Sequence, residues 1–493
     1  MNILMVAAEM APLVKVGGLA DVVGALPSAL VRRGHAVTVV LPRYGDLAVA
    51  DLAPWPGCRA VPLRLGHHMT RVRYLTWPQA PTAVRVVLVD APEWFDRPGI
   101  YAHPDGVPFS DTLERSAVLA QAALMIPELA DWPVDVVHAH DVQAALTPIL
   151  RRQWYGERGL PGPGRTVFTI HNLAHQDIVA ASDLARIDLP HALAVYPGPL
   201  EFFGRANLLK GALLASDLVT TVSPTYAREV KADPVYGCGL EGVLASLGDR
   251  FLGILNGVDQ ETWNPATDPH LPARFDRDDL AGKQICRRAL QEELGLVEGD
   301  GPLLGLVGRL VPQKGLDLVT DVLDRLLEIG CSLAVLGTGD PRYHELLDAA
   351  TARHPGRVAF RAGFSEELAH RIYAGSDLFL VPSRFEPCGL SQLYALRYGT
   401  PPVVRATGGL ADTVRDASGT QGTGFMFNQD APEAFWAALT RARALFADAR
   451  AWRDLQRRGM DCDFSWDAAA ERYEDCYRSL VADAPLRDEE PHD

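Results

Sequence analysis

Residues 381–390 read Val-Pro-Ser-Arg-Phe-Glu-Pro-Cys-Gly-Leu, and this stretch joins a predicted strand to a predicted helix. The apolar run that leads into it, residues 377–381, is typical of a buried parallel strand. After it, apolar residues at helical spacing predict a helix over residues 391–398, which Gly399 can end. Glu386 therefore lies in a strand-to-helix loop, at the edge of an α/β sheet where ligands bind.

The same loop combines a carboxylate with a place for an anion. The backbone amides of Cys388, Gly389 and Leu390 lie at or near a helix start, where free N–H groups suit an anion. The Glu386 carboxylate suits a group that becomes positively charged. A nucleotide-sugar carries both features, because its diphosphate is anionic and its anomeric carbon passes through an oxocarbenium-like state. The loop thus predicts a nucleotide-sugar site.

Length and charge limit the class of protein. A chain of 493 residues is too long for one ordinary core, so we expect two domains. With 47 basic and 62 acidic residues the formal charge is −15, which argues against a broad nucleic-acid or anionic-membrane surface. No apolar run approaches the roughly 18 residues that span a bilayer. We expect neither nucleic acid nor a membrane as a partner.

The cysteines and the first residues bear on the compartment. Seven cysteines are scattered without a C-x-x-C pair, which fits a reducing compartment better than a disulfide framework or a zinc module. The chain runs from Met1 straight into a strand-like segment without a basic leader, so we expect no signal peptide. Together these features predict a cytoplasmic protein.

The N-terminal half opens with a strand at residues 3–8, a loop with Lys15, Gly17 and Gly18, and then an amphipathic helix. Paired glycines let a backbone approach a phosphate while the lysine supplies charge. A tight turn with a solvated lysine explains the same letters, and the loop matches neither G-x-G-x-x-G nor a P-loop. By itself the loop leaves the two interpretations open.

Two further predicted strands of this half end in polar clusters. Residues 134–139 lead into His140 and Asp141, and residues 166–170 lead into His171. The carboxyl ends of parallel strands meet at one edge of a sheet, so these side chains belong to the same crevice. Metal binding by the histidines lacks a third ligand at suitable spacing. Each histidine can equally be a satisfied core or loop residue.

The C-terminal half repeats the architecture of the opening. A strand at residues 303–307 leads into a loop with Arg309, Lys314 and Gly315, followed by an amphipathic helix and another strand at residues 332–336. Cations in a loop are usually surface decoration, but these two lie at a strand's carboxyl end. Two such units predict an α/β protein of two Rossmann-like, doubly wound domains facing each other across a cleft.

One segment of the sequence has the composition of a linker, and two others match a metal-binding motif by letter. The turn residues 256–259 and the polar stretch after them, to residue 279, predict the linker between the domains. Asp276-Arg277-Asp278 and Asp461-Cys462-Asp463 match a D-x-D metal motif by letter, but neither follows an apolar strand. Helix capping explains the first better, so we expect no metal site.

From about residue 2 to 480 the chain resembles the bacterial glycogen synthases, of the family that also contains plant starch synthases. Each motif alone is modest, but their ordered set is specific. The resemblance rests on these stretches: K-V-G-G-L-A-D-V (15–22), H-A-H-D (138–141), T-I-H-N-L-A-H-Q (169–176), residues 201–230, N-G-V-D (256–259), R-L-V-P-Q-K-G-L-D (309–317), S-R-F-E-P-C-G-L (383–390), T-G-G-L-A-D-T-V (407–414) and D-F-S-W (463–466).

This resemblance implies a GT-B fold and a retaining glycosyltransferase. The enzyme would transfer glucose from ADP-glucose to the non-reducing end of an α-1,4-glucan such as glycogen, with no metal and no cofactor. With the domain boundary read from the sequence, the resemblance implies an acceptor and catalytic domain (1–255), a nucleotide-sugar-binding domain (256–465) and a helix packing back on the first domain (466–482). Residues 483–493 are polar, acidic and contain proline, so we expect a disordered tail.

The resemblance also assigns roles to single residues. Arg309 and Lys314 would stabilise the leaving ADP, Glu386 would favour positive charge near the anomeric carbon, and His171 would hold the glucose. Asp141 would orient donor or acceptor. The remaining donor-binding residues would be Lys15, Gly17, Gly18, Asp21, Asn256, Phe364, Cys388, Gly389, Leu390, Thr407, Gly408 and Gly409.

Three positions depart from the family pattern. Val142 stands where a tryptophan is common, Tyr394 where related enzymes have a ribose-binding glutamate, and Val16 where many bacterial members have threonine. Three other functions stay open at this stage: a UDP-glucose-dependent transferase, a small-acceptor transferase or epimerase of the same fold, and a non-catalytic glucan-binding protein. The last is disfavoured because binding alone needs no leaving-group cations.

Overall fold

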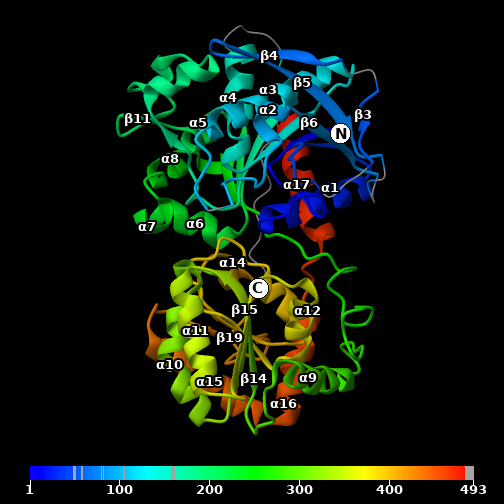
Figure 1. Cartoon of the computed structure of the whole chain (residues 1–493), viewed down its shortest axis with the longest axis vertical. Coiled ribbons are helices and arrows are strands. Elements are labelled where there is room, and N and C mark those ends of the chain that lie inside the picture. Colours follow the sequence, from blue (N-terminus) through cyan, green and yellow to red (C-terminus); the bar gives the residue numbers. More distant parts are fainter. Residues whose placement is uncertain are drawn as a thin grey trace. The chain divides into compact units, whose positions relative to one another are not determined.

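The computed structural model describes residues 1–47, 51–56, 59–78, 80, 83–104, 106–156 and 162–482, which form two compact units (Figure 1). Unit 1 contains Met1–Val222, Ala227–Ile254 and the described residues from 466 on; unit 2 contains Ser223–Tyr226 and Leu255–Ser465. The tail predicted at residues 483–493 lies outside the described residues.

Unit 1 is built on a ten-stranded sheet whose central strands are parallel. The β4–β5 hairpin and β3 extend one edge of the sheet in antiparallel pairing. In spatial order the strands are β13 (Phe251–Gly253), β12 (Leu218–Thr221), β8 (Arg165–Ile170), β7 (Val136–His140), β1 (Asn2–Val6), β2 (Ala36–Pro42), β6 (Arg85–Asp90), β5 (His68–Thr76) and β3 (Ala53–Pro54), with β4 (Val61–Leu65) paired to β5.

The parallel strands are almost wholly apolar because helices cover both faces of the sheet. A separate, small antiparallel sheet follows β8 in the chain and consists of β9 (Ile178–Val179), β10 (Glu201–Phe202) and β11 (Arg205–Asn207). The helices up to residue 246 are α1 (Gly18–Arg32), α2 (Pro92–Phe95), α3 (Thr112–Leu129), α4 (Leu146–Arg151), α5 (Leu208–Ala215), α6 (Pro224–Ala232), α7 (Pro234–Gly237) and α8 (Glu241–Ser246).

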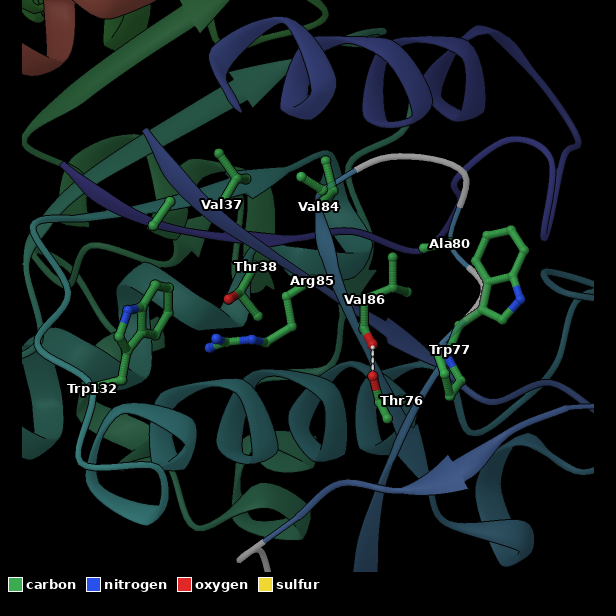
Figure 2. Close-up of a pocket in the computed structure, with 12 residues that line it drawn as sticks. Val37, Thr38, Thr76, Trp77, Ala80, Val84, Arg85, Val86 and Trp132 are labelled. Atoms are coloured by element: carbon green, nitrogen blue, oxygen red, sulfur yellow. Dashed lines mark hydrogen bonds between the residues drawn. The ribbon is translucent and has the colours of Figure 1, made fainter. Parts of the chain in front are cut away.

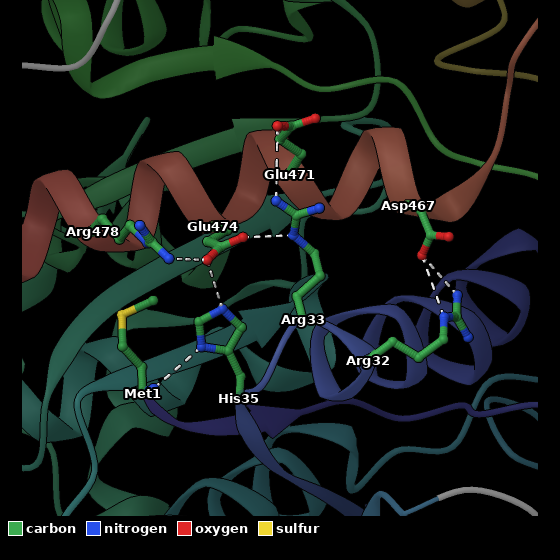
Figure 3. A network of polar contacts seen from close by, with 8 residues as sticks. All are labelled: Met1, Arg32, Arg33, His35, Asp467, Glu471, Glu474 and Arg478. Carbon is green, nitrogen blue, oxygen red and sulfur yellow. Dashed lines mark hydrogen bonds and ion pairs between the residues drawn. The ribbon is translucent and has the colours of Figure 1, made fainter.

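The last helix, α17 (Trp466–Val481), belongs to unit 1 and lies against α1 (Figure 3). Its apolar face joins the core of the unit through Trp466, Tyr473 and Tyr477. Its Glu474, almost fully buried, accepts from Arg33 at 2.5 Å and lies 3.3 Å from the His35 ring. Because a buried carboxylate is costly unless it is paired, these partners fix the position of α17 on the unit.

Unit 2 is a six-stranded, fully parallel sheet. Its strand order is β16 (Val358–Ala362), β15 (Ser332–Gly339), β14 (Leu303–Leu310), β17 (Leu378–Val381), β18 (Pro402–Arg405) and β19 (Phe425–Phe427). Its helices are α9 (Ala281–Leu294), α10 (Leu316–Glu328), α11 (Pro341–Arg353), α12 (Glu366–Gly375), α13 (Ser391–Arg397), α14 (Gly408–Thr413), α15 (Pro432–Phe446) and α16 (Ala449–Met460).

The stretch predicted as a linker, residues 256–279, packs onto unit 2 instead. The Trp263 indole stacks on the His370 ring with centroids 4.0 Å apart, and on the Tyr394 ring with centroids 3.8 Å apart. Phe275 is buried in the same cluster. Turn residues and polar letters suggested a linker, but these two aromatic side chains provide enough apolar area to anchor the segment.

Both units thus have the Rossmann-like architecture that the sequence predicts. In each, a strand-loop-helix-strand unit lies at the centre: β1, α1 and β2 in unit 1, and β14, α10 and β15 in unit 2. Among the described residues, no helix is both long and apolar enough to cross a bilayer.

Candidate active-site residues in each unit

In unit 1, Asp141 and His171 are brought together at the carboxyl ends of β7 and β8. Asp141 directly follows β7 and has a φ of 56°, a left-handed conformation that non-glycine residues rarely adopt. Its carboxylate accepts from the backbone N–H of His171 at 2.7 Å, and its own N–H donates to the Thr169 carbonyl at 3.0 Å. We call Asp141 and His171 the histidine site.

The imidazoles around this site are neutral. His171 Nε2 lies 3.1 Å from His140 Nδ1, and His138 bonds to Tyr477 and Thr169 at 2.7 and 2.6 Å. Burial lowers the pKa of His171 to about 3 and that of His138 to about 3, and it also lowers the pKa of His140. Each neutral ring has one N–H donor and one acceptor nitrogen, so neighbouring rings can hydrogen-bond without charge repulsion. His171 is therefore a fixed dipolar group and not a cation.

Burial acts on Asp141 in the opposite direction. It raises the pKa of the carboxyl group to about 7, although the N–H groups of His171 and Asn172 partly offset the shift by stabilising the charged form. The carboxyl group therefore changes its charge near neutral pH, as is useful in a general acid or base.

The Lys15–Gly18 loop, also in unit 1, is fixed by hydrogen bonds from its backbone to Glu9. This buried carboxylate accepts from the N–H groups of Val16 and Gly17 at 2.6 and 3.0 Å, and from the Tyr101 hydroxyl. Lys15 pairs with Asp21 at 2.6 Å, and both side chains are partly exposed. The Gly17 amide is therefore committed to Glu9 here, and the loop presents its lysine at the carboxyl end of β1.

We predict that Glu9→Gln loosens this loop. The amide oxygen can still accept from the Val16 and Gly17 N–H groups, but without the negative charge that strengthens those bonds, and its NH2 group leaves the Tyr101 hydroxyl proton without its acceptor. We expect a loss of about 1–3 kcal/mol in the free energy of unfolding and a weaker affinity for the nucleotide-sugar that the sequence predicts as ligand. Denaturant unfolding and donor titration measure both.

Glu93→Gln is the matched control, because Glu93 is paired with His68 at 2.9 Å but is half exposed. It should change neither quantity appreciably. Equal unfolding midpoints for the two variants would show that Glu9 does not hold the loop.

In unit 2, Lys314 and Glu386 form a close ion pair. Lys314 Nζ lies 2.5 Å from Glu386 Oε2, which also accepts from the Ser383 hydroxyl at 2.9 Å. The Glu386 side chain is 8% exposed and the Lys314 side chain 27%. We call Lys314, Ser383 and Glu386 the glutamate site. It places a carboxylate and an ammonium group side by side, both with limited access to solvent.

The two loops that carry this pair are joined through their backbones. Arg384 N–H donates to the Gln313 carbonyl at 2.8 Å, and the Gln313 side chain donates to the Phe385 carbonyl at 3.0 Å. Gly315 has a φ of +65°, and a Cβ there would lie 2.1 Å from the Pro382 carbonyl oxygen. Only glycine allows this approach, so the loops after β14 and β17 form one rigid piece.

The glycine pair at residues 408–409 has a similar packing role. A Cβ on Gly408 would lie 2.0 Å from the Glu386 carbonyl oxygen, and one on Gly409 would lie 2.2 Å from the Cys388 carbonyl oxygen. The Gly409 amide donates to the Glu386 carbonyl at 3.1 Å. The loop after β18, in which the buried Thr407 directly precedes α14, thus supports the backbone of the glutamate site.

Other predicted residues of unit 2 lie at the same edge of its sheet. Arg309 is exposed at the end of β14 and makes no side-chain hydrogen bond or ion pair with any described residue, so its charge is uncommitted. Asn256 is buried, and its Oδ1 has no hydrogen-bond partner among the described residues, as expected of a group that binds a ligand.

Cys388 and Phe364 differ in access to solvent. Cys388 is buried, which raises the pKa of its thiol to about 12, so it acts as an apolar wall rather than a nucleophile. Phe364 is 74% exposed beyond β16, where Gly363 has a φ of +114°. Gly389 turns the chain at a φ of 73° and Leu390 precedes α13.

Two of the three departures from the family pattern have structural roles. Val142 is buried in the turn after Asp141, and the Tyr394 ring stacks on Trp263 as part of the unit 2 core. Val16 is 56% exposed in the Lys15–Gly18 loop. No group of three or more described His, Cys, Asp or Glu side chains is arranged to hold a metal ion.

Sequence reasoning missed Glu9, Tyr101 and Ser383. Glu9 had a usable signal, since it is a single acidic residue within an apolar run just after β1. Ser383 lies within the stretch that predicted the site, but its letter alone does not show that its hydroxyl faces Glu386. Tyr101 lies 92 residues from Glu9 in an irregular segment, and no local pattern indicates that contact.

Comparison with known proteins identifies relatives along the whole chain. Residues 2–246 match the starch synthase catalytic domain family, and residues 289–452 match the group 1 glycosyl transferases. A glycogen synthase of Anaeromyxobacter sp. (strain Fw109-5) is 48% identical over 98% of this chain and 100% of its own length. Glycogen synthase 2 of Geobacter sulfurreducens is 44% identical over 98% and 99%.

Solved structures agree with this assignment. The catalytic domain of starch synthase IV from Arabidopsis thaliana, bound to ADP and acarbose, has a TM-score of 0.89 and 36% identity over 98% of this chain and 99% of that one. Sucrose-phosphate synthase from Thermosynechococcus elongatus shares the fold, with a TM-score of 0.60 at 17% identity.

Proposed function

This chain belongs to the glycogen and starch synthase family and transfers glucosyl groups to a glucan, and we propose that ADP-glucose is its donor. We further propose that glucose is added to the non-reducing end of an α-1,4-glucan, with retention of the anomeric configuration and without a metal ion. The observation that carries the proposal is the Lys314–Glu386 pair, which sets a cation and a carboxylate side by side at the carboxyl end of the unit 2 sheet.

In unit 2, the domain we assign to the nucleotide-sugar, the cations act on the leaving group. Negative charge grows on the diphosphate as the glycosidic bond breaks, and pre-placed Arg and Lys side chains stabilise it without reorganising. We assign this role to Arg309 and Lys314. The walls of the donor site would be Phe364, Cys388, Gly389 and Leu390, with the loop 407–409 and Asn256 beside them.

Glu386 acts on the sugar rather than on the diphosphate. Its carboxylate favours the positive charge that develops near the anomeric carbon, and it also binds sugar hydroxyls. The oxygen Oε2 already accepts from Lys314 and Ser383, which reduces its nucleophilicity. We therefore favour return of the acceptor from the same face over a covalent intermediate.

In unit 1, the domain we assign to the acceptor and to part of catalysis, the histidine site orients the reacting sugar. The neutral His171 and its backbone carbonyl would hold the glucose, and Asp141 would orient a hydroxyl of donor or acceptor. Lys15, Gly17 and Gly18 would contact the donor diphosphate, and Asp21 would orient donor or acceptor. Since the Gly17 amide is committed to Glu9, Lys15 carries most of this contact.

Asp141 gives the reaction a pH dependence. With a pKa of about 7, its carboxylate becomes protonated below neutrality, so kcat/KM should fall as pH drops through 7. Asp141→Asn keeps an acceptor oxygen for the His171 N–H but cannot ionise. We expect that variant to be slower and to lack this inflection in the pH profile.

The free energy of unfolding should depend on pH in the opposite direction to kcat/KM. The folded pKa lies above the ordinary value of 3.8, so the folded state keeps a proton that the unfolded state releases between these values. This contribution to the free energy of unfolding is present below pH 4 and is lost as pH rises to 7. If kcat/KM depends on pH in the same way in wild type and in Asp141→Asn, Asp141 does not have its assigned role.

The donor is tested directly by initial rates with ADP-glucose and UDP-glucose at equal concentrations, with glycogen as acceptor. A clear preference for ADP-glucose supports the proposal, in keeping with the ADP bound to the Arabidopsis relative. Preference for UDP-glucose would correct the donor and keep the mechanism. We also place the enzyme in the cytoplasm, consistent with the six described cysteines, which are all free thiols.

A further inference from the structure

Lys283, on α9 of unit 2, has almost no access to solvent, since the residue is only 3% exposed. Burial lowers the pKa of its ammonium group to about 7, and the negative charge of Asp377 partly offsets this shift. A buried charge is costly unless nearby polar atoms replace its water shell. The charged form of Lys283 therefore depends on the atoms that surround it.

Four oxygen atoms surround the Lys283 ammonium group. Its Nζ lies 2.5 Å from the Thr400 hydroxyl oxygen and 3.4 Å from the Tyr373 carbonyl oxygen. It lies 2.9 and 3.0 Å from the carbonyl oxygens of Ala374 and Tyr398. All four belong to neutral groups, and backbone carbonyl oxygens are also the groups that replace the water shell of a potassium ion in a protein. We call these four atoms the oxygen cage.

Contact with an aromatic ring does not explain the burial of this lysine. Lys283 Nζ lies 5.6 Å from the centroid of the Phe275 ring. In unit 1 the Arg85 guanidinium lies at a similar distance, 5.8 Å, from the Trp132 ring, yet Arg85 is exposed in an open hollow of about 310 Å³ (Figure 2). A cation–π contact thus requires no loss of solvent, so the oxygen cage is the feature that accounts for the position of Lys283.

The cage brings together the two ends of one segment of the chain. Tyr373 and Ala374 lie in the last turn of α12, where carbonyl groups have no partner within the helix. Tyr398 and Thr400 lie just after α13. Residues 375–397 between them contain β17, the loop of the glutamate site and α13, and we call them the β17–α13 segment. The Thr400 hydroxyl also donates to the Tyr373 carbonyl at 2.5 Å, so both ends meet at the ammonium group.

We propose that the Lys283 ammonium group fills a monovalent-cation site that closes the β17–α13 segment at its base and thereby positions Glu386. The last carbonyl groups of a helix carry partial negative charge, so one cation stabilises the ends of both helices at once. A segment whose two ends are joined has fewer conformations, which limits the displacement of the Glu386 loop. Because Lys283 is buried, it is a positioning residue and contacts no substrate. The inference rests on the proposed role of Glu386.

Lys283→Ala tests this site, because it removes the cation and leaves the oxygen cage empty. We expect kcat to fall about 10²-fold and the KM for ADP-glucose to change much less, since a small displacement of a reacting group mainly reduces turnover. KCl should restore part of kcat, and NaCl at the same concentration should not, because carbonyl oxygens replace the water shell of K⁺ more readily than that of Na⁺. Rates are compared just below pH 7, where the wild-type lysine is charged.

Hydrogen exchange measures the same site without any substrate. The backbone amides of residues 383–390 should exchange faster in Lys283→Ala than in wild type, and KCl should slow them again. Lys231→Met is the matched control, because Lys231 Nζ lies 5.7 Å from the Phe251 ring in unit 1 but is only partly buried. It should change neither kcat nor the exchange of residues 383–390.

Thr400→Val serves if Lys283→Ala does not fold. It removes one oxygen of the cage at a fully buried position and keeps the shape of the side chain, so kcat should fall and exchange should rise by smaller factors. Wild-type kcat and exchange in whichever variant folds would overturn the inference. Losses in Lys283→Ala that KCl does not reverse would also overturn it. Failure of the proposed role of Glu386 would differ, because Glu386→Gln would keep its turnover while exchange in Lys283→Ala would still respond to KCl.

Discussion

Replacing Glu386 by glutamine should lower turnover by about 10²–10³-fold while leaving the protein folded. Glutamine keeps the shape of the side chain, and its carbonyl oxygen can still accept from Lys314 and Ser383, which lie 2.5 and 2.9 Å from Oε2. What it loses is the negative charge that we propose to act beside the anomeric carbon. Because that charge is used in the transition state, kcat should fall far more than KM rises.

Glu433→Gln provides the matched control for this variant. Glu433 pairs with Arg325 at 2.7 Å in the same unit but is 77% exposed, so its loss should alter neither turnover nor thermal unfolding appreciably. Steady-state rates with donor and glycogen give kcat and KM for wild type and both variants. Turnover within a few-fold of wild type in a folded Glu386→Gln protein would show that the carboxylate takes no part in the reaction.

Lys314→Met should cause a loss of similar size, about 10²–10³-fold, for a different reason. Methionine approximates the aliphatic stem but removes the ammonium group to which we assign stabilisation of the departing diphosphate. It also leaves the nearly buried Glu386 carboxylate without its ion-pair partner, so some stability is lost with activity. Rates measured with saturating donor, together with denaturant unfolding, separate the two effects.

The double variant Lys314→Met/Glu386→Gln distinguishes catalysis from simple pairing. If the two side chains matter only because they neutralise each other, removing both restores stability and much of the activity. If each has its own role in the transition state, the double variant is at least as slow as either single one. The Arg325→Met/Glu433→Gln pair is the control cycle, and it should leave turnover unchanged throughout.

The sequence was most informative where strands end. Apolar runs followed by polar letters predicted where β7, β8 and β17 stop to within one residue. The strand predicted at residues 303–307 instead continues to Leu310, so Arg309 lies in β14 and not in the loop after it. The side chains at these strand ends are the ones the structure gathers at the carboxyl edge of each sheet. This works because parallel strands in a doubly wound sheet all present their carboxyl ends on one side. The register of each strand need not be known for that conclusion.

Contacts between distant segments could not be predicted in this way. The glycines at 315, 408 and 409 are letters that suit a phosphate loop, yet the structure shows that each is also required by a neighbouring carbonyl group. The hydrogen bond from Tyr101 to Glu9 joins segments 92 residues apart. Such requirements arise only when the loops are packed, so a single sequence does not reveal them.

Composition misled the interpretation of residues 256–279. Asn-Gly, Asp and Pro are typical of a linker, and the segment is largely without regular structure, as expected. Trp263 and Phe275 nevertheless pack into the unit 2 core, because burial of two large aromatic side chains outweighs the preference of the polar residues for solvent. Counting apolar area as well as turn residues would have corrected the prediction.

The most direct test of the account is transfer of labelled glucose from ADP-glucose to glycogen in the presence of EDTA, followed by digestion of the polymer with β-amylase. We predict rapid incorporation that chelation does not slow, and release of the label by the amylase, because glucose is added in α-1,4 linkage at non-reducing ends. Absence of incorporation from ADP-glucose, restoration of activity only by a divalent cation, or label that resists the amylase would contradict it.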